Sequence, residues 1–215
     1  MSTKDIDLKA EELIRKNKVI AAFKGYRGFP GNTCISVNEA VVHGIPDQRI
    51  VKDGDIVSLD LGIIYQGYYS DTAVTVPVGD ISPEARRLID VTRASLMRGI
   101  EQARVGNRLS DISFAVQSFV EMHGFSVVRD FVGHGIGRQL HEEPEIPNYG
   151  RPSEGPELLE GMVFCIEPMV NMGTHRTKTL EDGWTVVTAD GKPSAHFEHT
   201  IAITAHGPEI LTQGT

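Results

Sequence analysis

The chain has 215 residues, of which 40% are hydrophobic and 23% are charged, as in an ordinary folded domain rather than a disordered chain. Its net charge of −8 argues against the basic surface that nucleic-acid binding requires. No apolar run approaches the roughly 20 residues that cross a bilayer. The two cysteines, Cys34 and Cys165, form no disulfide framework and no Cys-x-x-Cys zinc site. We therefore expect a cytoplasmic protein that binds neither nucleic acids nor membranes.

The chain opens with a predicted helix and two short predicted strands. Ser2 and Asp5 form a helix-start pattern, and the apolar residues that follow recur on one helical face: Ile6, Ala10, Leu13 and Ile14. Strands are expected over residues 19–23 and 34–37, on either side of a loop rich in glycine and proline. A turn at residues 43–46 follows.

The segment 52–71 predicts a β-hairpin that carries two aspartates. A β-branched apolar run meets a turn at residues 66–67 and then returns, with Asp60 in the first arm and Asp71 in the second. A buried carboxylate has to be neutralised, hydrogen-bonded or bound to a cation. For this pair alone, an edge strand or pairing with Lys or Arg stays open. A shared divalent metal ion would satisfy both carboxylates at once.

Two longer helices and a strand are expected next. Ser82 as cap and a proline in the first turn begin a helix that extends to about residue 103. The apolar spacing predicts a further helix from Ser110 to about residue 123. A strand over residues 125–132 then leads into the sequence Gly-His-Gly-Ile-Gly.

The second half of the chain repeats the first. Asp60, in KDGDIVSLD, aligns with Glu167, in LEGMVFCIE, and Asp71 aligns with Glu198 at the start of a similar strand. An extra hairpin around Trp184 precedes that second strand. We expect the four acids to converge across a pseudo-two-fold axis.

Four carboxylates that meet in a core require cations, and two divalent ions balance them in formal charge. His134, in the glycine-rich sequence, favours Mn, Fe, Co or Zn over Ca, although a structural site for a hard ion is an alternative. The glycines could also form a phosphate-binding loop, but neither a GxGxxG fingerprint nor a Walker lysine is present. His141 follows close behind His134, which favours a catalytic role over a surface position, and His43 is a similar case before Pro46.

Several segments together resemble the type I methionine aminopeptidases of the pita-bread metallopeptidase family. They surround the Asp60 and Asp71 pair and cover nearly the whole chain: HGIPD, GHGIGRQLHEEPEIPNYG, GMVFCIEPMV and DGWTVVTADGKPSAHFEHT. The resemblance implies an α+β pita-bread fold, with two pseudo-symmetric αβ halves around a central antiparallel sheet. It implies one catalytic domain over residues 1–215, with half-repeats over about 1–80 and 81–215. It further implies hydrolytic removal of the N-terminal methionine from nascent proteins and peptides, favouring small second residues.

The same resemblance implies a site with two divalent ions, which could be Co, Mn, Fe or Zn. Asp60 then binds one ion, Asp71 and Glu198 bridge both, and His134 and Glu167 hold the other.

The remaining roles implied by the resemblance concern the substrate. Glu167 corresponds to the family's proton shuttle, and His141 and His43 correspond to histidines that contact the substrate and stabilise the reacting amide. Leu140 stands where many relatives carry an aromatic residue. The methionine pocket corresponds to Tyr26, Phe29, Cys34 and Trp184.

Two other readings of the same fold stay open. A proline-specific aminopeptidase would keep all five ligands, but the context of Trp184, the FEHT context of Glu198 and the lack of a large N-terminal domain argue against it. An inactive binding module is the second alternative, although such relatives usually lose ligands.

The repeat also predicts a difference between the halves. A helix precedes the 109–112 motif in the second half, whereas the matching residues 2–6 stand at the N-terminus, so one helix of the pair is missing. We expect an exposed apolar face that favours self-association or lowers stability. The family itself implies a monomer that acts near the ribosome.

Overall fold

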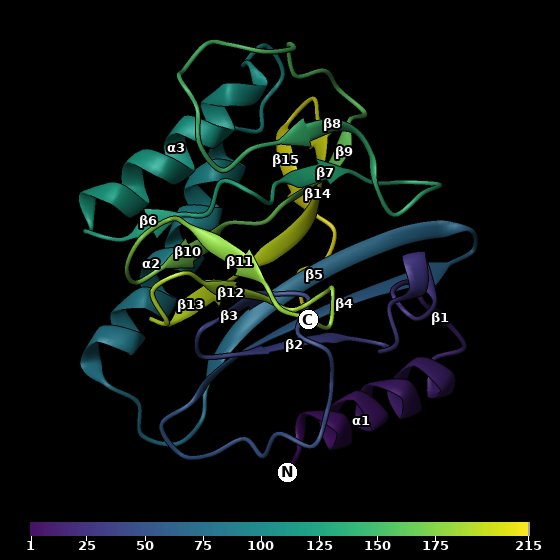
Figure 1. Cartoon of the computed structure of the whole chain (residues 1–215). Helices are drawn as coiled ribbons and strands as arrows, with labels where there is room; N and C mark the ends of the chain where they lie inside the picture. The colour runs from purple at the N-terminus through teal and green to yellow at the C-terminus, as the bar shows by residue number, and fades with distance from the viewer. Residues whose placement is uncertain (215) are drawn as a thin grey trace.

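The computed structural model describes residues 1–214 and is organised around a nine-stranded sheet with the strand order β1-β4-β5-β14-β9-β7-β8 (Figure 1). Strand β2 also pairs with β4, and β15 with β14. All assigned pairs are antiparallel, as expected for the α+β class. The strands of this sheet are β1 (Ile20–Ala21), β2 (Cys34–Val37), β4 (Ile56–Tyr65), β5 (Tyr68–Pro77), β7 (Gly133–Gly135), β8 (Glu142–Ile146), β9 (Val163–Ile166), β14 (Glu198–Thr204) and β15 (Gly207–Ile210).

Two smaller sheets of three strands flank the large one, in the orders β13-β10-β6 and β11-β12-β3. Their strands are β3 (Ala40–Val42), β6 (Ser126–Val127), β10 (Met169–Asn171), β11 (Thr177–Thr179), β12 (Val186–Thr188) and β13 (Ser194–His196). Strands β11 and β12 form the hairpin expected around Trp184.

Three α-helices cover the sheets. They are α1 (Thr3–Lys16), α2 (Pro83–Gln102) and α3 (Leu109–Met122). The expected caps are confirmed: Ser2 accepts from the backbone of Asp5, and Ser82 accepts from the backbone of Ala85. Leu13, expected on the inward face of α1, is 51% exposed, because this helix packs on the sheet mainly through Ile6. No helix among residues 1–214 is long and apolar enough to cross a bilayer.

The long β4–β5 hairpin is confirmed in its turn and its register. Ten residue pairs run from Ile56 opposite Pro77 to Tyr65 opposite Tyr68. The turn residues Gln66 and Gly67 both have positive φ angles, 51° and 80°, as the tight turns of such hairpins require.

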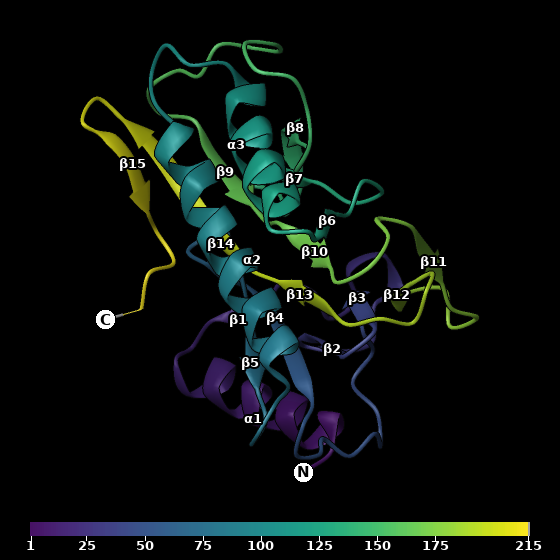
Figure 2. The same ribbon diagram turned by 90° about the vertical axis from the view of Figure 1, so that its left-hand side faces the viewer.

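The two faces of the large sheet pack against different parts of the chain. Alternate residues of a strand point to opposite faces, and in β9 the side chains of Phe164 and Ile166 join the core beneath α2 and α3. Cys165 between them belongs to a separate cluster on the other face. Helices α2 and α3 lie side by side (Figure 2). The opposite face is therefore free to carry a site.

Within the large sheet, the two halves of the chain meet at β5 and β14, where the assigned residue pairs are Glu198 opposite Ala73 and His199 opposite Thr72. Threonine hydroxyls extend this seam. Thr200 Oγ1 donates to the Asp71 carbonyl and accepts from the Asp71 amide, at 2.8 and 3.0 Å.

Two predicted strands are wrong in extent. The strand expected over residues 19–23 is reduced to β1. The strand expected over residues 125–132 is broken after β6 by a bend at the exposed residues Arg129 and Asp130. This bend carries the chain from the β13-β10-β6 sheet into the large sheet, so that β6 and β7 belong to different sheets.

Candidate metal centre

Three of the four predicted acids meet because of the strand register. Asp60 of β4 lies opposite Ala73 of β5, and Ala73 lies opposite Glu198 of β14, so the three residues form one row across the sheet. Asp71 precedes Ala73 by two residues and therefore faces the same side. One oxygen each from Asp60, Asp71 and Glu198 lies within 4.8 Å of the others. The small side chain of Ala73 leaves space between the carboxylates.

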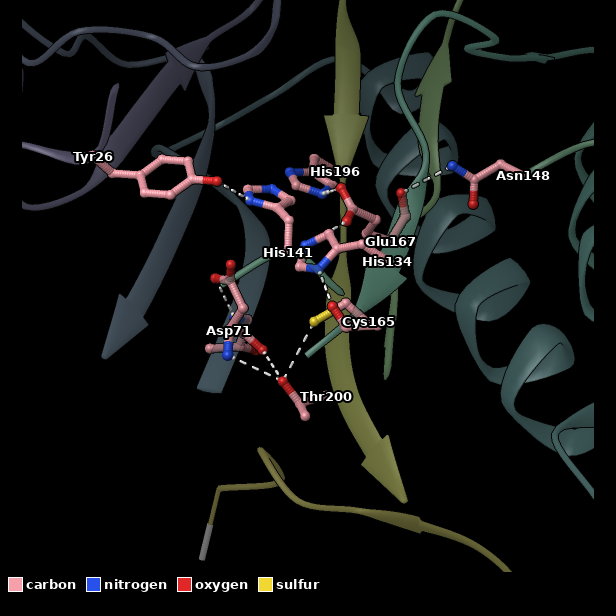
Figure 3. A network of polar contacts seen from close by, with 11 residues as sticks. Tyr26, Asp71, His134, His141, Asn148, Cys165, Glu167, His196 and Thr200 are labelled. Carbon is pink, nitrogen blue, oxygen red and sulfur yellow. Dashed lines mark hydrogen bonds and ion pairs between the residues drawn. The ribbon is translucent and has the colours of Figure 1, made fainter. Parts of the chain in front are cut away.

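The fourth acid, Glu167, directly follows β9, and the predicted histidine, His134, lies in β7; these two side chains complete the group. His134 Nε2 lies 3.5 Å from Glu167 Oε1, and His134 Nδ1 lies 2.9 Å from the Gly135 carbonyl, which leaves Nε2 free to face the centre (Figure 3). The flanking glycines allow the neighbouring strands to approach closely. A Cβ at Gly133 would lie 2.3 Å from the carbonyl oxygen of Cys165.

The electrostatics of the group are those of a cation site. Burial, followed by the neighbouring carboxylates, raises the pKa of Asp60, Glu167 and Glu198 well above the usual range, and burial raises the pKa of Asp71 to about 7. Four carboxylates in this environment cannot all ionise without nearby positive charge. A divalent cation supplies that charge and reverses the shift.

Unpaired buried atoms support the same conclusion. Asp60 Oδ1 and Glu198 Oε1 are buried and have no hydrogen-bond partner within residues 1–214. Buried polar atoms are normally paired, so each such atom requires an explanation. Carboxylate oxygens with one imidazole nitrogen form a donor set that suits Mn, Fe, Co or Zn. The residues present therefore fit divalent metal ions.

His196 also belongs to the site, although the sequence analysis did not identify it. The residue is 2% exposed, and its unpartnered Nε2 lies 3.7 Å from Glu167 Oε2. Burial lowers the pKa of His196 to about 3, so the ring is neutral and the contact is not an ion pair. Its position two residues before Glu198 was the available signal. The sulfur of Cys165 lies within 4.8 Å of ligand atoms of His134 and Glu198, but burial raises the pKa of this thiol.

The other two predicted histidines line the cavity beside the carboxylates. The ring centroid of His141 lies 4.2 Å from that of His134, and burial, followed by the neighbouring side chains of His134, Arg27 and His43, lowers the pKa of His141 to about 4. His43 makes edge contacts with the rings of Phe131 and Trp184, at 5.5 and 6.2 Å between centroids, and burial lowers its pKa. Both rings are therefore neutral near pH 7.

The predicted pocket residues line the same cavity of about 190 Å³. Phe29 and Trp184 meet edge to face at 5.2 Å between centroids. Cys34 lies opposite Asp60 in the β2–β4 pair, which places the pocket next to the metal ligands. Leu140 is also buried and lines this cavity. The sequence analysis missed further lining residues, which lie far apart in the chain: Phe23, Val42, Phe131 and Met169.

Comparisons with known proteins agree with this geometry. The model of Metallopeptidase family M24 matches residues 1–205. The chain is 59% identical over 212 residues to a methionine aminopeptidase of Clostridium perfringens, covering 99% of this chain and 85% of the relative. The crystal structure of methionine aminopeptidase from Thermotoga maritima superposes with a TM-score of 0.98 at 50% identity, covering 99% and 86% of the two chains. The prolidase of Pyrococcus horikoshii gives a TM-score of 0.77 at 25% identity and is covered over 55% of its length. The expected pita-bread fold is thereby confirmed.

Proposed function

The chain belongs to metallopeptidase family M24, and we propose that it is a methionine aminopeptidase that hydrolyses the first peptide bond of Met-initiated proteins and peptides. One observation carries this proposal: five ligand-type side chains converge next to an apolar pocket large enough for one amino-acid side chain. The relatives named methionine aminopeptidase extend over almost the whole chain.

We propose that the five residues hold two divalent ions. Asp60 would bind one ion, His134 and Glu167 the other, and Asp71 and Glu198 would bridge them, because these two carboxylates lie on the central strands β5 and β14. When bound, such a pair of ions activates water and polarises the scissile carbonyl. The donor set is compatible with Co, Mn, Fe or Zn.

Three side chains are assigned to the reaction itself. Glu167 is 13% exposed at the edge of the group, so it can exchange protons with water in the cavity and pass one to the leaving amine. Asn148 donates to the Glu167 carbonyl at 3.1 Å and steadies that part of the chain. His141 and His43, both neutral and both lining the cavity, would donate hydrogen bonds to the reacting amide.

The apolar end of the cavity would bind the methionine side chain. A flexible thioether packs well against aromatic rings and sulfur, and the cavity offers Tyr26, Phe29, Trp184 and the Cys34 thiol. We propose that the free α-amine lies near the ions, which limits cleavage to the first peptide bond, and that the restricted space beyond favours small second residues.

The experiment that tests this function is hydrolysis of a Met-Ala-Ser peptide together with elemental analysis of the protein. We expect release of free methionine and two equivalents of divalent metal. Loss of turnover after chelation and recovery on adding metal back would tie the two measurements together. A protein that binds two ions but releases no methionine from several Met-initiated peptides would refute the proposed substrate.

The alternatives make different predictions in the same assay. A proline-specific aminopeptidase would cleave Ala-Pro peptides in preference to Met-Ala-Ser. The comparisons argue against this, because the chain is 59% identical to a methionine aminopeptidase and 25% identical to a prolidase. An inactive binding module would release no amino acid, and the full set of five ligands argues against it.

We further propose that residues 1–215 form one catalytic domain of two half-repeats, over about 1–80 and 81–215, and that it acts in the cytoplasm on nascent chains near the ribosome. The order β4-β5-β14-β9 supports the repeat, because each half contributes one pair of strands.

Self-association stays a prediction. Val74 and Met97 line one groove and are 41% and 40% exposed. Light scattering would detect a dimer, whereas a monomer at high concentration would refute this prediction.

A further inference from the structure

The Tyr26 hydroxyl is the feature of the cavity that the roles above leave unexplained. Its oxygen lies 2.9 Å from Nδ1 of His141 (Figure 3). The other ring nitrogen, Nε2, therefore remains for a hydrogen bond to the substrate. We propose that Tyr26 is a positioning residue that donates its hydroxyl proton to Nδ1 and thereby keeps the His141 proton on Nε2. This inference rests on the proposed function only for its effect on turnover.

Packing fixes the plane of the His141 ring but not the position of its proton. The ring lies between two neighbours, with centroids 4.2 Å from His134 and 5.4 Å from Tyr26. Neither contact distinguishes the two ring nitrogens. A neutral imidazole has one N–H donor and one acceptor, so whichever nitrogen Tyr26 bonds decides what the other nitrogen offers.

The surroundings decide the direction of this hydrogen bond. If Nδ1 donated to the tyrosine oxygen, Nε2 would carry a lone pair and could not donate a hydrogen bond to the reacting amide, and the Tyr26 hydroxyl proton would have no acceptor within residues 1–214. With the proton on Nε2, the ring offers a donor there instead. The Tyr26 hydroxyl makes no other hydrogen bond within residues 1–214, and a phenol is a good donor. The hydroxyl therefore donates to Nδ1.

The loop that carries Tyr26 is built to hold it in place. Residues Tyr26–Gly28 form the short 3₁₀-helix η1, closed by hydrogen bonds from the Tyr26 amide to the Phe23 carbonyl and from the Gly25 amide to the Phe29 carbonyl, at 2.9 and 2.8 Å. Arg27 has a φ angle of 49°, an unfavourable value for a residue with a side chain. Such a conformation persists only where the surrounding structure imposes it. The hydroxyl is therefore placed before any substrate binds.

The effect on the reaction differs from that of a pocket wall. A donor that must be ready when negative charge develops on the substrate acts mainly on kcat. A residue that only contacts the methionine side chain acts mainly on KM. Loss of a partner that orients a metal-bound histidine typically costs about 10–100-fold, and we expect an effect of similar size for the partner of His141. Tyr26→Phe keeps the ring and removes only the hydroxyl, so we expect a fall in kcat of about tenfold with KM nearly unchanged.

The test combines kinetics with a direct measurement of the proton. The kinetic measurements use Tyr26→Phe, His141→Ala and the double variant. Tyr69→Phe is the control, because Tyr69 packs against the same apolar cluster as Tyr26, but its hydroxyl makes no hydrogen bond with a histidine within residues 1–214. If Tyr26 acts through His141, the second substitution costs nothing further in the His141→Ala background. Nitrogen-15 spectra of the substrate-free, zinc-loaded protein report which nitrogen of His141 carries the proton. We expect a protonated Nε2, and a changed Nδ1 signal in Tyr26→Phe alone.

Three results would overturn the proposal. They are a protonated Nδ1 in the unmodified protein, an equal loss of kcat from Tyr26→Phe with and without His141, or a rise in KM alone. The spectra need no substrate, so they decide the position of the proton even if Met-Ala-Ser is not cleaved. Absence of methionine release with a protonated Nε2 would refute the proposed function and leave the hydrogen bond standing.

Discussion

Removing the metal ions should make the protein's stability depend on the ionisation of Asp71. Burial raises the pKa of this carboxyl from 3.8 to about 7. A raised carboxyl pKa contributes stability that is fully present below the unfolded value and is lost as the pH rises to the folded value. The difference of roughly three pKa units corresponds to about 4 kcal/mol at pH 8, at 1.36 kcal/mol per unit. Because neighbouring acids share this repulsion, 4 kcal/mol is an upper value.

The substitution Asp71→Asn isolates that contribution. Buried histidines such as His196 and His134 have lowered pKa values, and their contribution to stability changes with pH in the opposite direction. The comparison of variant with unmodified protein cancels them. In the chelated protein, we expect Asp71→Asn to be neutral or destabilising near pH 4 and stabilising by up to about 4 kcal/mol at pH 8. In the metal-loaded protein it should be destabilising, because a ligand is lost.

Urea unfolding at the two pH values, with and without chelator, measures these differences. Asp90→Asn is a suitable control, because Asp90 is an exposed aspartate on α2 whose one ion pair among residues 1–214 is with Arg93. A free-energy difference between Asp71→Asn and the unmodified chelated protein that does not change with pH would show that Asp71 is not destabilised by ionisation. The cation-site reasoning for this residue would then be wrong.

The remaining predictions concern single side chains of the site. Glu198→Ala should abolish most turnover and lower the metal content below two equivalents, because the carboxylate proposed to bridge both ions is lost; two tightly bound ions with near-native turnover would contradict this. His141→Ala should keep both ions by elemental analysis but lower kcat by about 10²–10³, the usual loss for one donor to a developing oxyanion; loss of metal would make His141 a ligand. Trp184→Ala should raise the KM for Met-initiated peptides about tenfold or more through lost apolar contact, with unchanged metal content; an unchanged KM would reduce Trp184 to a packing residue.

The sequence predicted most of what depends on local signals and on the repeat. Caps at Ser2 and Ser82 and the turn after Tyr65 rest on short-range chemistry, and they are found as expected. The convergence of the carboxylates follows from the alternation of side chains along paired strands. His196 was missed because the repeat matches only the acids, and the one signal for this histidine was its position two residues before Glu198. The strand expected over 125–132 was wrong because an apolar run does not reveal that its two ends pair in different sheets.

The pairing of β5 with β14 has a consequence for the stage of folding at which the chain can become active. Asp60 and Asp71 lie in the first half of the chain, and His134, Glu167 and Glu198 lie in the second, so neither half carries a complete centre. Two assigned residue pairs and hydrogen bonds of threonine hydroxyls join β5 to β14, so docking of the halves brings the ligands together. We expect a chain that lacks the second half to hydrolyse no peptide, since the proposed set of five ligands is complete only when Glu198 pairs in the sheet. On the proposed ligand assignment, uptake of two ions would report that both halves are present and folded, and the chain would hydrolyse no peptide before that point.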